Sequence, residues 1–399
     1  MSFRPSRSLE SRMSIPRRFV ALSGLLAAAT VSSLAARGAE TPASGAETTE
    51  SKVPVVYVVP MSGQMGTDIH PSIYDEVIKD VMEVKPDVIV YQLKSADIDN
   101  NFYLAGNDDR REFGLAKIGE YRDLVRSLHE KLDARQVMWV EDSVGLGSLL
   151  ALSWPEMYMS EGGRLWGLAR ISSMAAGWSD PDVASKMLNA WVGMGNGFLQ
   201  IGGHPLEIGW AMMRPEYNLS ASFKGRKVSW ANDTAGQWVV DSSGDNVANF
   251  NASLAEDMGL SQGTVENLDD LMFLMGFREY EEVESGKEMV EKYVSDWRRT
   301  FDRCKTWWAD AQQKMGWASG DDAIKYLGSA KTDMERILRA CRQYPAVEAR
   351  WQQDYGMSIL QLELQIEGIK DQIGDMRRGN QGRGRGGSNR GRGGGGRGL

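Results

Sequence analysis

The most constraining feature of this 399-residue sequence is a run of β-branched and apolar residues at 53–61, Val-Pro-Val-Val-Tyr-Val-Val-Pro-Met. A continuous run of this kind is typical of a strand that is buried on both faces. Two further runs, at 88–93 and 136–140, have the same character, and segments with helical spacing precede them at 71–81 and 118–132. This alternation of strand and helix predicts an α/β domain with a parallel sheet and right-handed crossovers.

The loops that follow the three predicted strands are where a functional site is expected. Ligands in open parallel sheets bind beyond the carboxyl ends of the strands. In this sequence those ends are residues 61–66, 94–100 and 141–148.

A helical region is predicted to begin at residue 279. Residues 279–315, 321–343 and 345–375 carry apolar residues at helical spacing. The last of these segments contains a seam that is either internal or between subunits. The residues of this seam are Ile359, Leu362, Ile366, Ile369 and Ile373. The Arg/Gly repeats at 377–399 predict a disordered tail.

The N-terminus has the features of an export signal. Arg17 and Arg18 precede an uncharged stretch of apolar and small residues, and the sequence around 33–38 suits cleavage by a signal peptidase. We predict a signal peptide at 1–39, a disordered spacer at 40–52, and a periplasmic or secreted protein. The alternative is a tether formed by an uncleaved signal, although the apolar stretch is short for a membrane span.

Cysteine, histidine and charge limit the chemistry further. Cys304 and Cys341 either pair in an oxidising compartment or are two separate core residues. With three histidines and no Cys-x-x-Cys motif, the sequence predicts neither a metal site nor a cofactor. Basic residues concentrate near both ends, and the acidic body between them argues against broad nucleic-acid binding by that body.

Several segments together resemble one protein family. The strands at 55–60, 87–91 and 137–141, the segment Gly-Ser-Leu-Leu-Ala-Leu at 147–152, and the segment at 251–260 are similar in order and spacing to NfeD-like and SppA-like serine peptidases. The resemblance implies a ClpP/crotonase-like β-α-β spiral core at 53–278. An α-helical bundle or coiled-coil region at 279–376 would follow it.

The resemblance also implies a Ser/Lys dyad, in which a lysine takes the proton of an attacking serine. The family serine stands two residues before the glycine that matches Gly147, and that position here is Gly145, which has no nucleophile. Lys186 matches the family lysine, with an exposed helical lysine as the alternative. Ser143 and Ser148 are the nearby candidates for a relocated nucleophile, with packing or capping as their alternative role.

The loop after the second strand departs from the family as well. It reads Leu-Lys-Ser-Ala-Asp at 93–97, where the family has Thr-Pro-Gly-Gly. The glycines that would let backbone N–H groups approach a substrate are absent. By the resemblance, the substrate-binding positions are Ser95, Ala96, Gly145, Leu146 and Gly147. The two departures predict a degenerate enzyme.

Three hypotheses for function follow. The first is a pseudo-enzyme of the cell envelope, which acts as a homo-oligomeric scaffold or binds an extended peptide or an envelope protein. The second is an active envelope serine endopeptidase with a relocated serine. In the third, the tail at 377–399, which resembles RGG-type tails, binds an anionic polymer, lipid or nucleic acid.

Overall fold

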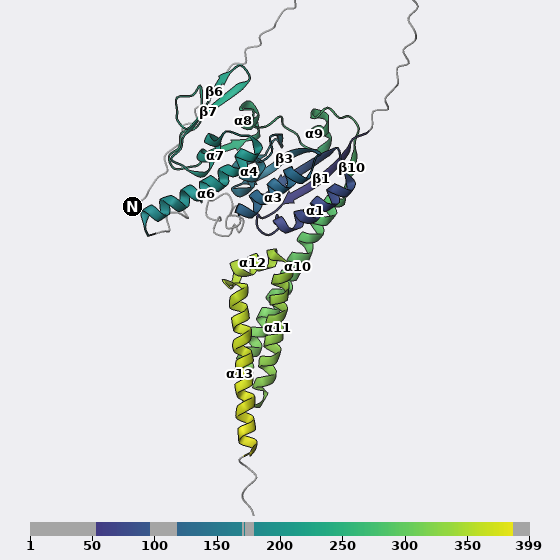
Figure 1. Ribbon diagram of the computed structural model, residues 1–399, viewed down its shortest axis with the longest axis vertical. Coiled ribbons are helices and arrows are strands. Elements are labelled where there is room, and N and C mark those ends of the chain that lie inside the picture. Colours follow the sequence, from purple (N-terminus) through teal and green to yellow (C-terminus); the bar gives the residue numbers. More distant parts are fainter. Residues whose placement is uncertain (1–52, 96–117, 170, 172–178, 386–399) are drawn as a thin grey trace, which may run out of the picture. The chain divides into compact units, whose positions relative to one another are not determined.

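The computed structural model describes residues 53–95, 118–169, 171 and 179–385. The predicted signal peptide, the predicted spacer and residues 386–399 of the predicted tail lie outside the described residues. Figure 1 shows an α/β core followed by long helices. The expected α/β class, with a parallel sheet and a helical C-terminal region, is confirmed.

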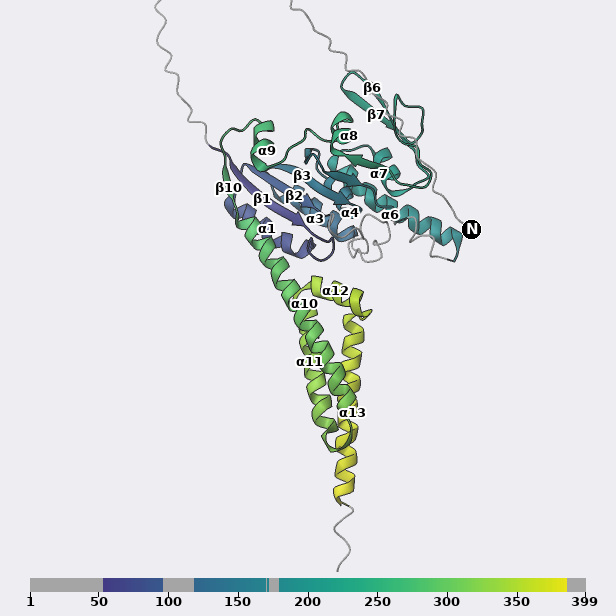
Figure 2. The same cartoon turned by 180° about the vertical axis from the view of Figure 1, so that it is seen from behind.

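Three parallel strands form the centre of the core. β2 (Val88–Lys94) pairs in parallel with β1 (Val55–Ser62) and with β3 (Arg135–Val144). α1 (Pro71–Val84) and α3 (Ile118–Lys131) lie on one face of this sheet, whereas α9 (Leu268–Leu274) lies on the other (Figures 1 and 2). The sheet is therefore covered on two sides, as the uninterrupted apolar runs predict.

The side chains of β1 alternate between two hydrophobic clusters. Tyr57, Val59 and Met61 belong to the cluster that includes α1 and α3, whereas Val56 and Val58 belong to the cluster that includes α9. Successive side chains of a strand point to opposite faces, so one apolar run supplies both clusters. All five of these residues are at most 1% exposed.

Two strands pair with β3, and one further strand pairs with β1 at the opposite edge of the sheet. β4 (Met157–Met159) pairs with the middle of β3, and β5 (Arg164–Trp166) pairs with its end. β9 (Asn249–Asn251) runs antiparallel to β5, and β10 (Glu281–Val283) is parallel to β1. The helix predicted from residue 279 therefore begins later, because its first residues form a short charged strand.

Smaller elements complete the core. A separate three-stranded sheet has β6 at its centre, between β7 and β8. The bounds are α4 (Leu146–Ala151), α6 (Pro181–Gly202), α7 (Leu206–Met213), β6 (Leu219–Lys224), β7 (Lys227–Ala231), β8 (Trp238–Asp241) and α8 (Ala252–Asp257).

The helical region, residues 285–385, has a hydrophobic cluster of its own. It consists of α10 (Ser285–Trp317), α11 (Ala323–Gln343), α12 (Pro345–Tyr355) and α13 (Ile359–Arg385), with a short 3-10 turn at Gly320–Asp322. The helix predicted at 345–375 is two helices, because Gly356 adopts a left-handed conformation with φ of 63° and ends α12. α13 continues into the predicted tail, as far as residue 385.

Burial in this cluster shows how the predicted seam and the two cysteines are packed. Leu362, Ile366 and Ile369 are buried within the chain, so the seam packs internally. Cys304 and Cys341 are buried free thiols, and desolvation raises the pKa of each to about 12.

The first turns of α10 are packed directly on β1. Hydroxyl groups of Tyr57 and Ser285 both donate to the Asp80 carboxylate, at 2.6 and 2.5 Å. Farther along α10, Tyr293 and Val294 contact both the cluster around α1 and the cluster of the helical region. α10 therefore belongs to two hydrophobic cores. None of the described helices is long and apolar enough to cross a membrane.

We predict that Gly286→Ala destabilises the protein whereas Gly328→Ala does not. A Cβ at Gly286 would lie 2.5 Å from Cε1 of Tyr57 and 2.8 Å from the carbonyl oxygen of Val58. Overpacking of this kind costs about 1–3 kcal/mol. Gly328, inside α11, has open space at its Cβ position, so alanine there should stabilise the helix by about 1 kcal/mol or less.

Urea unfolding of the two variants and the unchanged protein measures this difference. Equal unfolding midpoints for both variants would contradict the close packing of α10 on β1.

Candidate functional site

The candidate site begins where β3 ends and α4 starts. Gly145 joins the two elements with φ of 67° and ψ of −126°, a conformation that L-residues with a Cβ rarely adopt. Its N–H donates to the Trp166 carbonyl at 2.9 Å, which fixes the turn against β5. The chain thus turns sharply at the position that the resemblance assigns to the nucleophile, and the residue there has no side chain.

Ser143 and Ser148 lie on either side of this turn and contact each other. Both are completely buried, and their Oγ atoms are 3.0 Å apart. The Ser143 hydroxyl donates to the Arg164 carbonyl at 3.0 Å, so Ser148 is the donor in the bond between the two serines. Both hydroxyl protons are therefore used inside the protein.

Ser95 and Gly147 bring the second and third strand ends together. The N–H of Ser95 donates to the Asp142 carbonyl at 2.9 Å. A Cβ on Gly147 would lie 2.0 Å from Oγ of Ser95, so the glycine provides the space that the serine occupies. Within the described part of the chain, the buried Ser95 Oγ has no hydrogen-bond partner. Leu146 is also buried, and Ala96 lies outside the described residues.

Lys186 is exposed on the early part of α6. α6 meets α4 at Gly195, where an added Cβ would lie 3.2 Å from Cδ1 of Leu149. Lys186 precedes that point by about 13 Å along the helix axis. Among the described residues, it forms no hydrogen bond or ion pair. The structure thus brings Ser143, Ser148, Ser95 and the glycines together, and leaves Lys186 apart from them.

An ion pair between Asp142 and Arg164 lies next to this cluster. Asp142 is 3% exposed and receives two hydrogen bonds from Arg164, of which the one between Nε and Oδ1 is 2.7 Å long. The hydrogen bonds to Asp142 raise the pKa of Arg164. The Arg164 guanidinium also lies 4.9 Å from the centre of the Trp166 ring. Local sequence patterns did not identify this pair, although Asp142 lies in one of the three expected loops.

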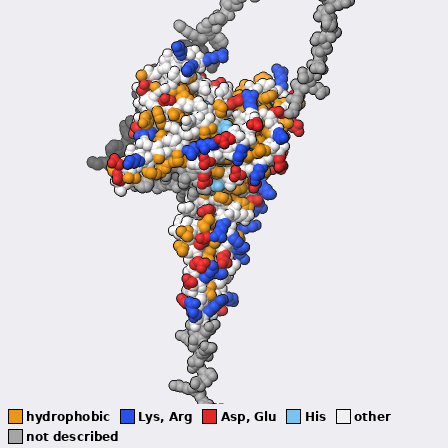
Figure 3. All heavy atoms as spheres, viewed as in Figure 1, with side chains coloured by type: hydrophobic (Ala, Val, Ile, Leu, Met, Phe, Trp, Pro, Cys, Tyr) orange, Lys and Arg blue, Asp and Glu red, His pale blue; other side chains and the backbone are white. Residues whose placement is uncertain are grey.

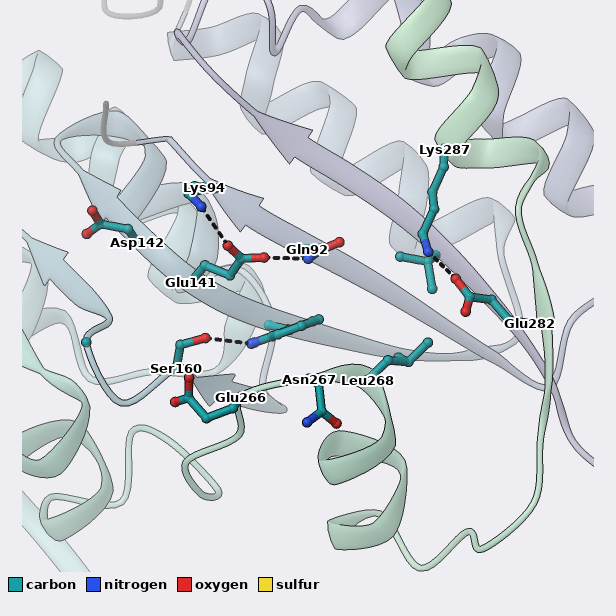
Figure 4. Close-up of a pocket in the computed structure, with 13 residues that line it drawn as sticks. Gln92, Lys94, Glu141, Asp142, Ser160, Glu266, Asn267, Leu268, Glu282 and Lys287 are labelled. Atoms are coloured by element: carbon teal, nitrogen blue, oxygen red, sulfur yellow. Dashed lines mark hydrogen bonds and ion pairs between the residues drawn. The ribbon is translucent and has the colours of Figure 1, made fainter. Parts of the chain in front are cut away.

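A polar pocket of about 520 Å³ opens beside the cluster, on the sheet face that carries α9 (Figure 4). Strands β1, β2 and β3 form its floor, and β10, α10 and the start of α9 border it. The residues that line it are Val58, Gln92, Lys94, Trp139, Glu141, Asp142, Ser160, Gly162, Glu266, Asn267, Leu268, Glu282 and Lys287.

Both lysines of this pocket are paired with carboxylates, whereas Glu266 accepts a hydrogen bond from the backbone N–H of Glu161 at 2.6 Å. Lys94 and Gln92 approach Glu141 from two sides, with 3.1 Å between Nζ of Lys94 and the carboxylate (Figure 4). Lys287 pairs with Glu282 across the pocket rim. The pocket offers fixed donors and acceptors, which suits binding of a polar ligand such as a peptide backbone.

Among the described residues that line the pocket, no serine hydrogen-bonds to a lysine or histidine as a nucleophile does to its base. Ser160 accepts a hydrogen bond from the Trp139 indole at 3.1 Å, and Lys94 is held by Glu141. Among the described residues, no three His, Cys, Asp or Glu side chains gather in a way that could hold a metal ion.

We predict that Gly147→Ala and Ser95→Gly are energetically coupled. Gly147→Ala alone should destabilise the protein by about 1–3 kcal/mol, because the new methyl group overlaps Ser95. Ser95→Gly removes the overlapping atoms, so the double variant should recover about 1 kcal/mol or more of that loss. Urea unfolding of the four proteins measures the coupling, and Gly162→Ala, with open space at its Cβ position, is the control. Strictly additive effects would contradict the contact.

Comparisons with known proteins identify similar folds only. No protein-family model matches the sequence, and no curated protein matches it significantly. A variant of the 1510-N membrane-bound stomatin-specific protease, solved with a substrate peptide, is 12% identical, with 56% of this chain and 80% of that chain covered and a TM-score of 0.35.

Two other solved structures have similar values. The 1510-N membrane protease specific for a stomatin homolog from Pyrococcus horikoshii is 13% identical, with 55% and 78% covered and a TM-score of 0.32. A peptidase from Plasmodium falciparum is 13% identical, with 53% and 96% covered and a TM-score of 0.33. At this level of similarity, the neighbours say nothing about activity.

Proposed function

We propose that this protein is a non-catalytic member of the peptidase-type α/β folds, and that it binds an extended peptide or another protein instead of cleaving it. The observation that carries the proposal is the state of the two serines. Ser143 and Ser148 are completely buried and donate their hydroxyl protons to internal acceptors. A nucleophile must instead reach the substrate and pass its proton to a base.

The cost of freeing either serine supports the proposal. Releasing the Ser143 hydroxyl would break its hydrogen bond to the Arg164 carbonyl, at a cost of about 0.5–1.5 kcal/mol. Gly145 supplies no alternative nucleophile, and the exposed Lys186 approaches neither serine. The alternative of an active endopeptidase with a relocated serine would require a rearrangement of both the turn and α6.

The polar pocket is the favoured place for the ligand. Its two lysines are already paired with Glu141 and Glu282, so the lining needs no anionic ligand to neutralise them. A ligand with backbone amides fits such a lining better than a strongly anionic one. Export to the cell envelope and assembly into a homo-oligomer belong to the same proposal. Binding of polyanions by the Arg/Gly tail is an alternative function.

We predict that the purified full-length protein is not labelled by a fluorophosphonate probe and does not cleave a peptide library. Ser143→Ala, Ser148→Ala, Lys186→Ala and Gly145→Ser should leave both readouts at background, because the candidate base Lys186 lies apart from positions 143, 145 and 148. Mass spectrometry of the labelled protein and of its peptide products measures this, with an active serine peptidase as the positive control.

The urea unfolding midpoints of the same variants show which of these residues stabilises the fold. Ser143→Ala should lower the free energy of unfolding by about 1–3 kcal/mol. Lys186→Ala should change it by less than about 0.5 kcal/mol, since exposed substitutions rarely cost more. Stoichiometric labelling that disappears in Ser143→Ala and in Lys186→Ala would overturn the proposal.

A further inference from the structure

A second groove lies in the helical region, away from the candidate site. It runs between α10 and α11 and has a volume of about 540 Å³. Its lining residues are Asp296, Arg299, Thr300, Arg303, Trp307, Arg336, Arg339, Ala340, Gln343 and Tyr344. Figure 3 shows Lys and Arg side chains gathered along the edge of the helical region that these two helices form.

Four arginines and one carboxylate make this groove strongly basic. Asp296 pairs with Arg299 at 2.8 Å, and Arg336 pairs at 2.9 Å with Asp333, which Lys314 also contacts. The nearby acidic side chains are thus already shared among several cations. Within the described residues, Arg303 and Arg339 form no ion pair.

This positive charge is not needed to hold the helices together. Arg303 and Arg339 are exposed, and within the described residues the only hydrogen bond of either side chain is from Nε of Arg339 to the Glu335 carbonyl, at 3.4 Å. Arg299 and Arg303 are neighbours on successive turns of α10, a spacing at which like charges repel. In a chain of formal net charge −8, a groove with two arginines that have no ion pair among the described residues favours an anionic ligand.

We propose that the α10–α11 groove binds an anion that carries several phosphate groups. The planar donor fork of arginine matches phosphate oxygens, and Thr300, Gln343 and Tyr344 add neutral donors beside the four guanidinium groups. The Arg336 guanidinium lies 6.0 Å from the centre of the Trp307 ring, which holds it at the groove wall.

The lining favours phosphate over an acidic peptide. Trp307 and Ala340 are its main apolar residues, so the groove offers little to anchor the apolar side chains of a peptide. A phospholipid headgroup, a polyol-phosphate polymer and soluble polyphosphate share the phosphate chemistry. The test below separates membrane-bound from soluble sources.

The first experiment is calorimetric titration of the full-length protein with inorganic tripolyphosphate at low and moderate salt. The test variant is Arg303→Gln/Arg339→Gln, which should weaken binding by about tenfold or more, since two charge-assisted contacts are lost. The matched control is Arg226→Gln/Lys227→Gln, which removes two exposed cations at the turn between β6 and β7 and should bind within about twofold of the unchanged protein.

Every variant retains the Arg/Gly tail, so a difference between the two double variants reports the groove alone. Arg303→Lys/Arg339→Lys keeps the charge but not the fork, and should bind with intermediate affinity. Circular dichroism confirms that each variant is folded.

Cosedimentation with phosphatidylglycerol vesicles, beside phosphatidylcholine vesicles, identifies the source of the phosphate. Groove-dependent binding to the anionic vesicles supports a lipid headgroup, and binding of tripolyphosphate without vesicle binding supports a soluble ligand. The proposal is overturned if Arg303→Gln/Arg339→Gln binds tripolyphosphate as tightly as the unchanged protein. It is equally overturned if an oligoglutamate peptide binds in a groove-dependent manner and tripolyphosphate does not.

Discussion

The burial of β1 on all sides is the constraint on which the rest of the structure depends. Its side chains supply two hydrophobic clusters, and its backbone is bonded to β2 on one edge and to β10 on the other. β1 therefore lies between the two clusters, and the alternating direction of its side chains connects them.

The strand ends bring small and polar residues together at a sharp turn. The turn at Gly145 joins a strand to a buried helix, and Ser95 meets Gly147 across the sheet. The polar groups there bond to one another, and the Asp142–Arg164 pair fixes β5 beside β3. Groups held in this way are preorganised, and preorganisation lowers the entropic cost of binding a ligand.

Much of the core could be predicted from the sequence because its signals are local. The runs at 53–61 and 88–93 encode buried strands by composition alone, and their order brings the three strand ends together. β10 escaped prediction because Glu281–Val283 is short and acidic, and its pairing with β1 is a long-range contact. The bend at Gly356 escaped it because apolar spacing continues on both sides.

The site was harder to predict than the fold because it depends on long-range contacts. Ser143, Ser148 and Gly145 were found because they follow one strand. Arg164 was not found, because only the pairing of β5 with β3 carries it to Asp142. The exposure of Lys186 depends on where α6 meets α4, which no local pattern encodes.

The continuity of α10 has a consequence for how the protein loses its structure. This 33-residue helix begins against β1, and its residues Tyr293 and Val294 pack into two cores at once. A fluctuation that opens the helical region must therefore remove apolar contacts from the α/β core as well. The free energies of local unfolding of the helical region and of the α/β core are therefore coupled. Amide protons near Tyr293 and Val294 should exchange with solvent as one cooperative unit.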